Sequence, residues 1–276
     1  MDIPQNAYQS DLVYKNTPQR DLQLTFLPPL EEKCESAPVY FLITGGGWCV
    51  EKRHDVMVFL CSAIEGLRQK GFAVVSIDYR VYPEGVSIRE IITDCFDAAR
   101  YIAHFADVLK IDKQNFYLSG HSAGAHLALM VSYAPQNMFV SDYEFRDTFA
   151  VKAVAAISPP TILYDKTTHN LGKLSELFPM IDTQEEREYA SPISYVSNNC
   201  PPTLLCAGTS DWVVFSNSSE KLYKKLKEYN VYSQLMLSVC GGHMFEQVHD
   251  IVTPSITAEE MQKGIIDFAL EHISNI

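Results

Sequence analysis

The chain has 276 residues, 47% hydrophobic and 20% charged, which is the composition of an ordinary globular protein and excludes a disordered chain. It carries 22 Lys and Arg against 34 Asp and Glu, a formal net charge of −12, so nucleic acid and anionic membranes are disfavoured as partners because both select a positive surface. The seven cysteines are odd in number and include no C-x-x-C pair, which indicates reduced thiols. The N-terminus lacks a secretory pattern and no apolar run is long enough for a membrane helix, so we expect a cytoplasmic protein.

Short apolar runs alternate along the chain with longer segments of helical periodicity. The predicted strands are 39–44, 72–77, 116–119, 153–158, 203–207 and 233–239, and the predicted helices are 88–106, 217–229 and 261–268. Continuous rather than alternating apolarity is typical of strands that are covered on both faces, as in a parallel sheet. The sequence therefore predicts one α/β domain over 1–276, with ligands bound at the carboxyl ends of the strands.

One segment interrupts this alternation. Residues 159–200 separate two predicted strands and are too many for a simple connection. Their scattered apolar residues favour a small helical cap inserted over the sheet. A single helix followed by a long surface loop is the alternative that the sequence leaves open.

Three consecutive glycines, Gly45 to Gly47, follow the first of these predicted strands. Because they carry no side chains, their backbone N–H groups can approach a ligand oxygen closely. We expect Gly46 or Gly47, together with Ala123, to form an oxyanion hole. A phosphate-binding loop is the rival interpretation, but the chain has no G-x-x-x-x-G-K-[ST] motif there.

The strand predicted at 116–119 continues into Gly-His-Ser-Ala-Gly at 120–124. This G-x-S-x-G pattern between a strand and a helix is the nucleophile elbow, a sharp turn that lifts the serine oxygen above the sheet. It predicts Ser122 as a nucleophile. His121 and His126 lie beside the elbow and are interpreted as structural.

A serine hydroxyl needs a base, and the base needs an acid that orients it. Of the eight histidines, only His243 follows a predicted strand later in the chain. Asp211 follows the strand at 203–207, 89 residues after Ser122 and 32 before His243, and the order Ser, Asp, His is that of the α/β hydrolases. Asp165 is the alternative acid. If Asp211 is not the acid, it is interpreted as a turn residue, because aspartate is common in turns after strands. Asp78 precedes the serine and is expected to brace its loop through Arg80.

The side chains next to these groups are candidates for a substrate pocket, and we name Trp48, His121 and Trp212. Motifs for other chemistry are missing. The sequence contains no H-E-x-x-H metal motif and no G-x-G-x-x-G that opens a βαβ unit, so neither a metal nor another cofactor is expected.

In these motifs the chain resembles α/β-hydrolase-fold esterases with a Gly-Gly-Gly-Trp oxyanion loop, of the type related to hormone-sensitive lipase. The resemblance extends from residue 39 to the C-terminus and is carried by 45–48, 78–84, 120–127, Asp211 and His243. The form of 120–127, Gly-His-Ser-Ala-Gly-Ala-His-Leu, looks like that of bacterial acetyl-xylan-esterase-like proteins, which are often labelled lipase/esterase or sugar hydrolase. Kynurenine formamidases are also similar. The chain departs from the pattern at Thr44, where the family has histidine, and at Phe215, where it has proline.

The resemblance implies a serine carboxylesterase that cleaves short-chain acyl esters, acetylated sugars among them, through an acyl-enzyme on Ser122. The first alternative is hydrolysis of aryl formamides by the same residues. The second is a binding protein on a hydrolase scaffold, which the presence of both nucleophile and base disfavours. For the esterase, the expected partner is its small-molecule ester substrate. Exposed edge strands of the sheet would also allow a homodimer.

Overall fold

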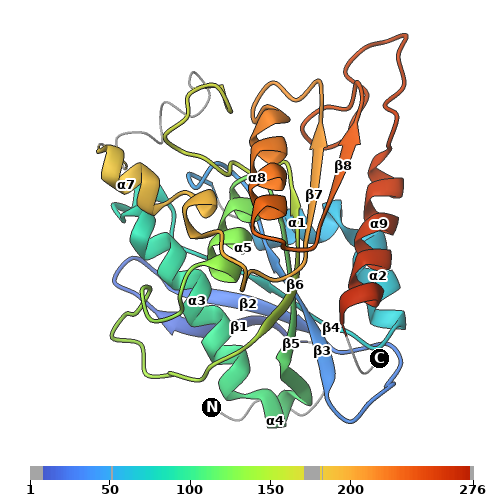
Figure 1. Ribbon diagram of the computed structural model, residues 1–276. Coiled ribbons are helices and arrows are strands. Elements are labelled where there is room, and N and C mark those ends of the chain that lie inside the picture. The colour runs from blue at the N-terminus through green and yellow to red at the C-terminus, as the bar shows by residue number, and fades with distance from the viewer. Residues whose placement is uncertain (1–8, 51, 171–180, 182, 274–276) are drawn as a thin grey trace.

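A single sheet runs through the part of the chain that the computed structural model describes, residues 9–50, 52–170, 181 and 183–273 (Figure 1). Its strands are β1 Gln9–Asn16, β2 Asp21–Leu27, β3 Ala37–Ile43, β4 Ala73–Ile77, β5 Ile111–His121, β6 Val151–Ile157, β7 Thr203–Gly208 and β8 Ser233–Ser238. They follow one another across the sheet in the order β1-β2-β4-β3-β5-β6-β7-β8. The strands from β3 to β8 are parallel, whereas β2 pairs antiparallel with both β1 and β4. The carboxyl ends of six strands therefore meet at one edge.

All six predicted strands are present, and the structure adds two that the sequence analysis missed. The hairpin of β1 and β2 extends the sheet beyond β4. Its outer strand mixes exposed and half-buried residues with the buried Tyr14, and so lacks the continuous apolar run that marks the parallel strands. Strand β5 begins at Ile111, five residues before the predicted start at 116. The sequence analysis missed this part because most of it is polar and only partly buried.

Helices cover both faces of the sheet. The described helices are α1 Arg53–Phe59, α2 Cys61–Gln69, α3 Ile88–His104, α4 Ala106–Leu109, α5 Ala123–Tyr133, α7 Gln184–Tyr189, α8 Asn217–Glu228 and α9 Ala258–His272, with 3₁₀ turns η1 Tyr82–Glu84 and η3 Pro192–Tyr195. One apolar core packs α3, α5 and α8 against the sheet, and a second packs α1, α2 and α9 against the other face (Figure 1). Helix α5 is apolar on nearly every side, which suits a helix enclosed at the centre of the molecule.

Buried ion pairs lie beneath the carboxyl edge of the sheet, and they differ from the sequence-based expectation. Arg53 Nη1 donates to both carboxylate oxygens of Asp78, at 3.0 and 3.1 Å. Arg80 instead pairs with Asp94, through Nε at 2.8 Å and Nη2 at 2.9 Å. The expected pairing of Asp78 with Arg80 is therefore wrong, because α1 and α3 each bring a closer partner of opposite charge.

The predicted cap, 159–200, falls partly outside the described residues, since 171–180 and 182 are not described. Its described part contains the short helices α7 and η3, and η3 packs against α5. The cap interpretation stays a prediction. In the same described portion of the chain, no helix combines the length and apolarity that crossing a membrane requires.

Candidate active site

Ser122 occupies a strained turn between β5 and α5. Its backbone angles are φ 55° and ψ −122°, a conformation that costs a non-glycine residue about 1–3 kcal/mol and persists only where the surroundings hold it. Two hydrogen bonds do so: the N–H of Ser122 donates to the carbonyl of Ile157 at 2.8 Å, and the N–H of His126 donates to the carbonyl of Ser122 at 3.0 Å. This is the geometry of a nucleophile elbow.

The two glycines of the elbow let α5 approach β3 directly. A Cβ added to Gly124 would lie 2.0 Å from the carbonyl oxygen of Ile43, and one added to Gly120 would lie 2.5 Å from the carbonyl carbon of Gly124. The same approach brings the glycine loop beside the elbow, since a Cβ on Gly45 would lie 3.4 Å from the Cβ of Ser122. The motif is therefore required by packing.

The glycine loop presents unused backbone donors. Gly46 has φ +117°, and a Cβ there would lie 1.9 Å from the carbonyl oxygen of Val50, so only glycine fits this turn. The carbonyl of Gly46 accepts from the N–H groups of Cys49 and Val50. Within the described residues, the N–H groups of Gly46, Gly47 and Ala123 donate to no other residue. They are thus available to a ligand oxygen.

Thr44 lies where the family pattern has histidine, and its hydroxyl and carbonyl groups both form hydrogen bonds at the start of the glycine loop. Its hydroxyl donates to the carbonyl of Lys52 at 3.1 Å. The fully buried Tyr79 hydroxyl donates to the carbonyl of Thr44 at 2.9 Å. Two hydroxyls from different segments therefore fix the start of the loop.

Trp48 anchors the far end of the loop. Its side chain is only 4% exposed, and its indole N–H donates to Nδ1 of His126 at 3.2 Å. Nε2 of His126 therefore carries the ring proton and donates to the carbonyl of Ala190 at 2.6 Å, while burial lowers the pKa of His126 to about 4. These contacts give Trp48 a packing role. Contact with a substrate stays a prediction for Trp48 and for the half-exposed Trp212.

Asp211 and His243 form a close pair. Nδ1 of His243 donates to Oδ2 of Asp211 at 2.6 Å, and the carboxylate is fully buried. The other carboxylate oxygen accepts from the backbone N–H groups of Val213 and Val214, at 2.8 and 3.0 Å. With both oxygens engaged, the carboxylate cannot rotate, so it holds the imidazole in the tautomer whose Nε2 is free to accept a proton.

Asp165, the alternative acid, lies elsewhere. Its carboxylate accepts from Lys221 Nζ at 2.5 Å and from the hydroxyl of Thr167 at 2.6 Å. The hydrogen bond from Lys221 is the main reason that the pKa of Asp165 falls to about 2. The structure therefore brings Asp211, and not Asp165, to His243.

His243 also contacts the elbow. Its carbonyl oxygen lies 3.0 Å from Nε2 of His121, the residue before Ser122, and the two imidazole rings are 4.6 Å apart. Between the described residues there is no hydrogen bond from Ser122 Oγ to His243, a bond that in enzymes is often long until substrate binds. Nucleophile, acid and base candidates thus gather at one edge of the sheet.

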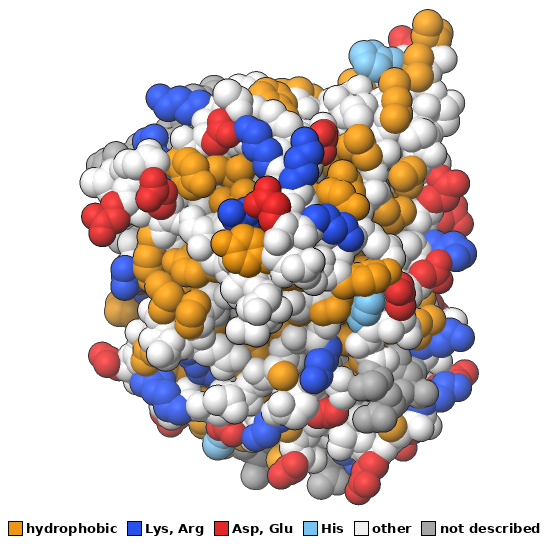
Figure 2. Space-filling view, viewed as in Figure 1, with side chains coloured by type: hydrophobic (Ala, Val, Ile, Leu, Met, Phe, Trp, Pro, Cys, Tyr) orange, Lys and Arg blue, Asp and Glu red, His pale blue; other side chains and the backbone are white. Residues whose placement is uncertain are grey.

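A small cavity adjoins this edge. It has a volume of about 200 Å³ and is bordered by the glycine loop, the elbow and α1. Its walls are Thr44, Gly45, Gly46, Val50, Lys52, Asp55, Val56, Phe59, His121 and Met244. Of the three side chains proposed for a substrate pocket, only His121 belongs to this wall. Beyond it, the segment between β8 and α9 projects from the molecule with apolar side chains on its surface, and Ile251 there is 94% exposed (Figure 2).

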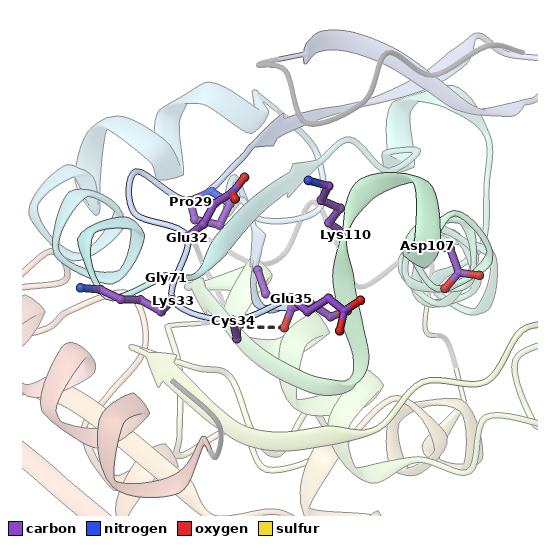
Figure 3. A pocket seen from close by; sticks show the side chains of 10 residues that line it. Pro29, Glu32, Lys33, Cys34, Glu35, Gly71, Asp107 and Lys110 are labelled. Carbon is purple, nitrogen blue, oxygen red and sulfur yellow. Dashed lines mark hydrogen bonds between the residues drawn. The ribbon is translucent and has the colours of Figure 1, made fainter.

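A larger hollow of about 550 Å³ lies at the opposite edge of the sheet, near the amino ends of β3, β4 and β5 (Figure 3). Ala37, Gly71 and Lys110 belong to its wall, together with acidic side chains and Cys34. Among the described residues that line it, there is no histidine that could act as a base toward Cys34. We therefore place the candidate active site at the carboxyl edge.

Residues 25–226 match the family model described as BD-FAE, which is well over half of the chain. The chain belongs to the BD-FAE family. Its sequence is 25% identical over 240 residues to a probable isoprenylcysteine alpha-carbonyl methylesterase from Oryza sativa, covering 82% of this chain and 55% of the relative. It is 28% identical over 105 residues to a kynurenine formamidase from Drosophila melanogaster, covering 38% of this chain and 33% of the relative.

The same fold is present in a solved esterase from Thermogutta terrifontis with propionate bound. The two chains superpose with a TM-score of 0.78 at 21% identity, covering 98% of this chain and 96% of the other. This similarity establishes the α/β-hydrolase fold for the BD-FAE chain. The chain spans about half the length of the curated relatives it matches across most of its own length.

The roles of two residues of this BD-FAE site escaped the sequence analysis. Tyr79, which lies in the stretch 78–84 that carries the resemblance, supports the glycine loop, and the hydroxyl of Ser158 donates to the carbonyl of His243 at 2.8 Å. Both side chains act on backbone carbonyls, and residue types alone do not show which carbonyl a side chain will reach. The one available signal was position, since Ser158 directly follows a strand at the carboxyl edge of the sheet.

Proposed function

We propose that this BD-FAE protein hydrolyses carboxylic esters with short acyl groups, using Ser122 as nucleophile, His243 as base and Asp211 as the orienting acid. The observation that carries the proposal is the buried Asp211–His243 pair, 2.6 Å between Oδ2 and Nδ1, at the edge where the strained Ser122 turn lies. A hydroxyl in such a turn, an oriented imidazole and unused N–H donors are the parts that acyl transfer needs.

In this mechanism, Ser122 Oγ attacks the ester carbonyl while Nε2 of His243 takes the hydroxyl proton. The carbonyl oxygen becomes an oxyanion, which accepts hydrogen bonds from the N–H groups of Gly46 or Gly47 and of Ala123, each worth about 3 kcal/mol in the transition state. His243 then gives its proton to the alcohol, which leaves. A water molecule, deprotonated by His243, then attacks the acyl-serine, and His243 returns this proton to Ser122 Oγ as the carboxylic acid is released.

The size of the adjoining cavity favours small groups. Its volume of about 200 Å³ is below the roughly 300 Å³ at which pockets begin to enclose drug-sized ligands. The Thermogutta esterase with the same fold is described with propionate and with butyrate bound. Esters of acids with two to four carbons fit this range, and the form of the elbow motif favours acetylated sugars among them.

Hydrolysis of aryl formamides is the second candidate, supported by the similarity to a kynurenine formamidase. A formyl group is the smallest acyl group and would use the same nucleophile and oxyanion donors. Rates measured in parallel on N-formylkynurenine and on acetylated xylo-oligosaccharides separate the two substrate classes.

The test is the hydrolysis of p-nitrophenyl esters of increasing chain length by the wild type and by Ser122→Ala. We expect the wild type to prefer acetate to butyrate and the variant to lose at least about 10³-fold in kcat. Ser132→Ala is the matched control, because Ser132 lies on helix α5, directly after the elbow, and among the described residues its hydroxyl donates to the carbonyl of Ala128 alone. Equal rates for wild type and Ser122→Ala would rule out the nucleophile, and failure of a fluorophosphonate to label Ser122 would favour a binding protein.

A further inference from the structure

The carbonyl oxygen of His243 is held by two side-chain donors from different strands. The hydroxyl of Ser158, after β6, donates to it at 2.8 Å. Nε2 of His121, at the end of β5, lies 3.0 Å from the same oxygen. Both contacts lie at the carboxyl edge of the sheet, whereas His243 itself belongs to the segment that leaves β8.

Ser158 has a backbone conformation that its residue type does not favour. Its φ is 50°, in the left-handed region where a side chain costs about 1–2 kcal/mol relative to glycine. The residue is 1% exposed, and its N–H donates to the carbonyl of Cys206 at 2.8 Å, which fixes the turn. Glycine would adopt this turn without strain but would supply no hydroxyl, so the hydroxyl is the group that serine adds here.

His121 is suited to remain a neutral donor. Because a carbonyl only accepts, Nε2 of His121 must carry the ring proton. Burial, followed by the nearby His243, lowers the pKa of His121 to about 3, so the ring stays uncharged at neutral pH. Among the described residues, His243 lowers this pKa and Asp211 raises it, while Lys52 and Asp55 line the same cavity wall as His121. A neutral ring 4.6 Å from His243 also avoids repelling the imidazolium that forms during the reaction.

We propose that Ser158 and His121 are positioning residues that clamp the backbone of His243 and thereby fix its imidazole relative to Ser122. With Asp211 as its one partner, the imidazole of His243 could still rotate about that single hydrogen bond. The two donors to the carbonyl of His243 also restrain its backbone, and so limit where the ring can lie. The proposal rests on the proposed ester hydrolysis, because it gives His243 the role of base. Misplacing a catalytic group by about 1 Å can cost about 10²-fold in rate, so removing the clamp should reduce kcat rather than weaken binding.

The kinetic test uses variants that separate the donor from its surroundings. Ser158→Gly removes the hydroxyl and relieves the strained φ, so it should fold at least as well as the wild type yet lose about 10- to 100-fold in kcat. His121→Phe removes the donor but keeps a planar ring, and His121→Gln keeps an N–H donor. We expect His121→Phe to lose about 10- to 100-fold in kcat and His121→Gln to keep at least about tenfold more kcat than His121→Phe. KM should change by less than about threefold in Ser158→Gly, because Ser158 is not part of the cavity wall that His121 lines.

A second measurement does not depend on turnover. The proton on Nδ1 of His243, in its 2.6 Å hydrogen bond to Asp211, should give a low-field ¹H NMR signal that disappears in Asp211→Asn. Loss of the clamp should broaden or shift this signal in Ser158→Gly and His121→Phe but not in His121→Gln. Because the signal needs no substrate, it reports on the clamp even if the chain hydrolyses no ester.

Two results would overturn the proposal. The first is wild-type kcat and an unchanged low-field signal in folded Ser158→Gly and His121→Phe. The second is an equal loss in His121→Phe and His121→Gln, which would show that the shape of the ring matters rather than its N–H. Thermal unfolding of each variant confirms that the comparison is made between folded proteins.

Discussion

Replacing Asp211 by asparagine is the sharpest test of the orienting pair. The substitution conserves the size of the side chain. Two backbone N–H groups donate to Oδ1 of Asp211, so the atom at this position must be a hydrogen-bond acceptor. The amide oxygen must take that place, because an NH₂ group there would face two donors. In Asp211→Asn the NH₂ group therefore turns toward Nδ1 of His243, where Oδ2 now accepts at 2.6 Å.

A donor in that position forces Nδ1 of His243 to accept, so the ring proton moves to Nε2. That atom is the one expected to take the proton of Ser122. In a Ser-His-Asp triad, this wrong tautomer lowers kcat by about 10⁴-fold, which corresponds to about 5.4 kcal/mol in the activation free energy. We expect a loss of this size with little change in stability, because the backbone hydrogen bonds to the amide oxygen remain.

The assay is the steady-state hydrolysis of p-nitrophenyl acetate near pH 8, with thermal unfolding as a check on folding. Asp165→Asn is the matched control, since that carboxylate pairs with Lys221 instead, and its kcat should stay within about twofold of wild type. The reasoning fails if Asp211→Asn keeps more than a tenth of the wild-type kcat, or if Asp165→Asn loses as much.

Three further predictions concern stability, measured by urea unfolding. Gly124→Ala places a Cβ 2.0 Å from the carbonyl oxygen of the last β3 residue and should lower the free energy of unfolding by about 2 kcal/mol or more; an unchanged value would contradict the packing argument. Arg53→Leu removes the main partner of the buried Asp78 and should cost about 3 kcal/mol, whereas Lys263→Met breaks an exposed pair and should change stability by less than about 0.5 kcal/mol. The pKa of His126 is about 4 in the fold against 6.5 in its ordinary state, so the unfolded chain binds more protons between these values. Stability should therefore rise with pH across this window, and His126→Gln should reduce the slope by about 1.4 kcal/mol per pH unit; equal slopes would refute the assignment.

Some elements carry enough local information to be predicted. Strands β3 to β7 were recognisable because strands enclosed on both faces are largely apolar, whereas β8 lies at the edge of the sheet and is mostly half-buried. The β1–β2 hairpin was not recognisable, because most of β1 is exposed or only half-buried and its place in the sheet depends on pairing between β2 and β4. The partner of Asp78 was also not predictable. Asp78 pairs with Arg53 and not with Arg80, because a buried charge pairs with the opposite charge that packing brings closest.

By itself, the sequence determined the parallel sheet, the elbow at Ser122 and the order of serine, aspartate and histidine, because each depends on residue types that are local in the chain. The tertiary structure decided that Asp211 rather than Asp165 meets His243, since both follow strands and both have the same chemistry. It also decided that Ser158 and His121, 85 and 122 residues from His243, meet its backbone carbonyl. Every residue carries such a carbonyl, so no sequence pattern can say which one a distant side chain will reach.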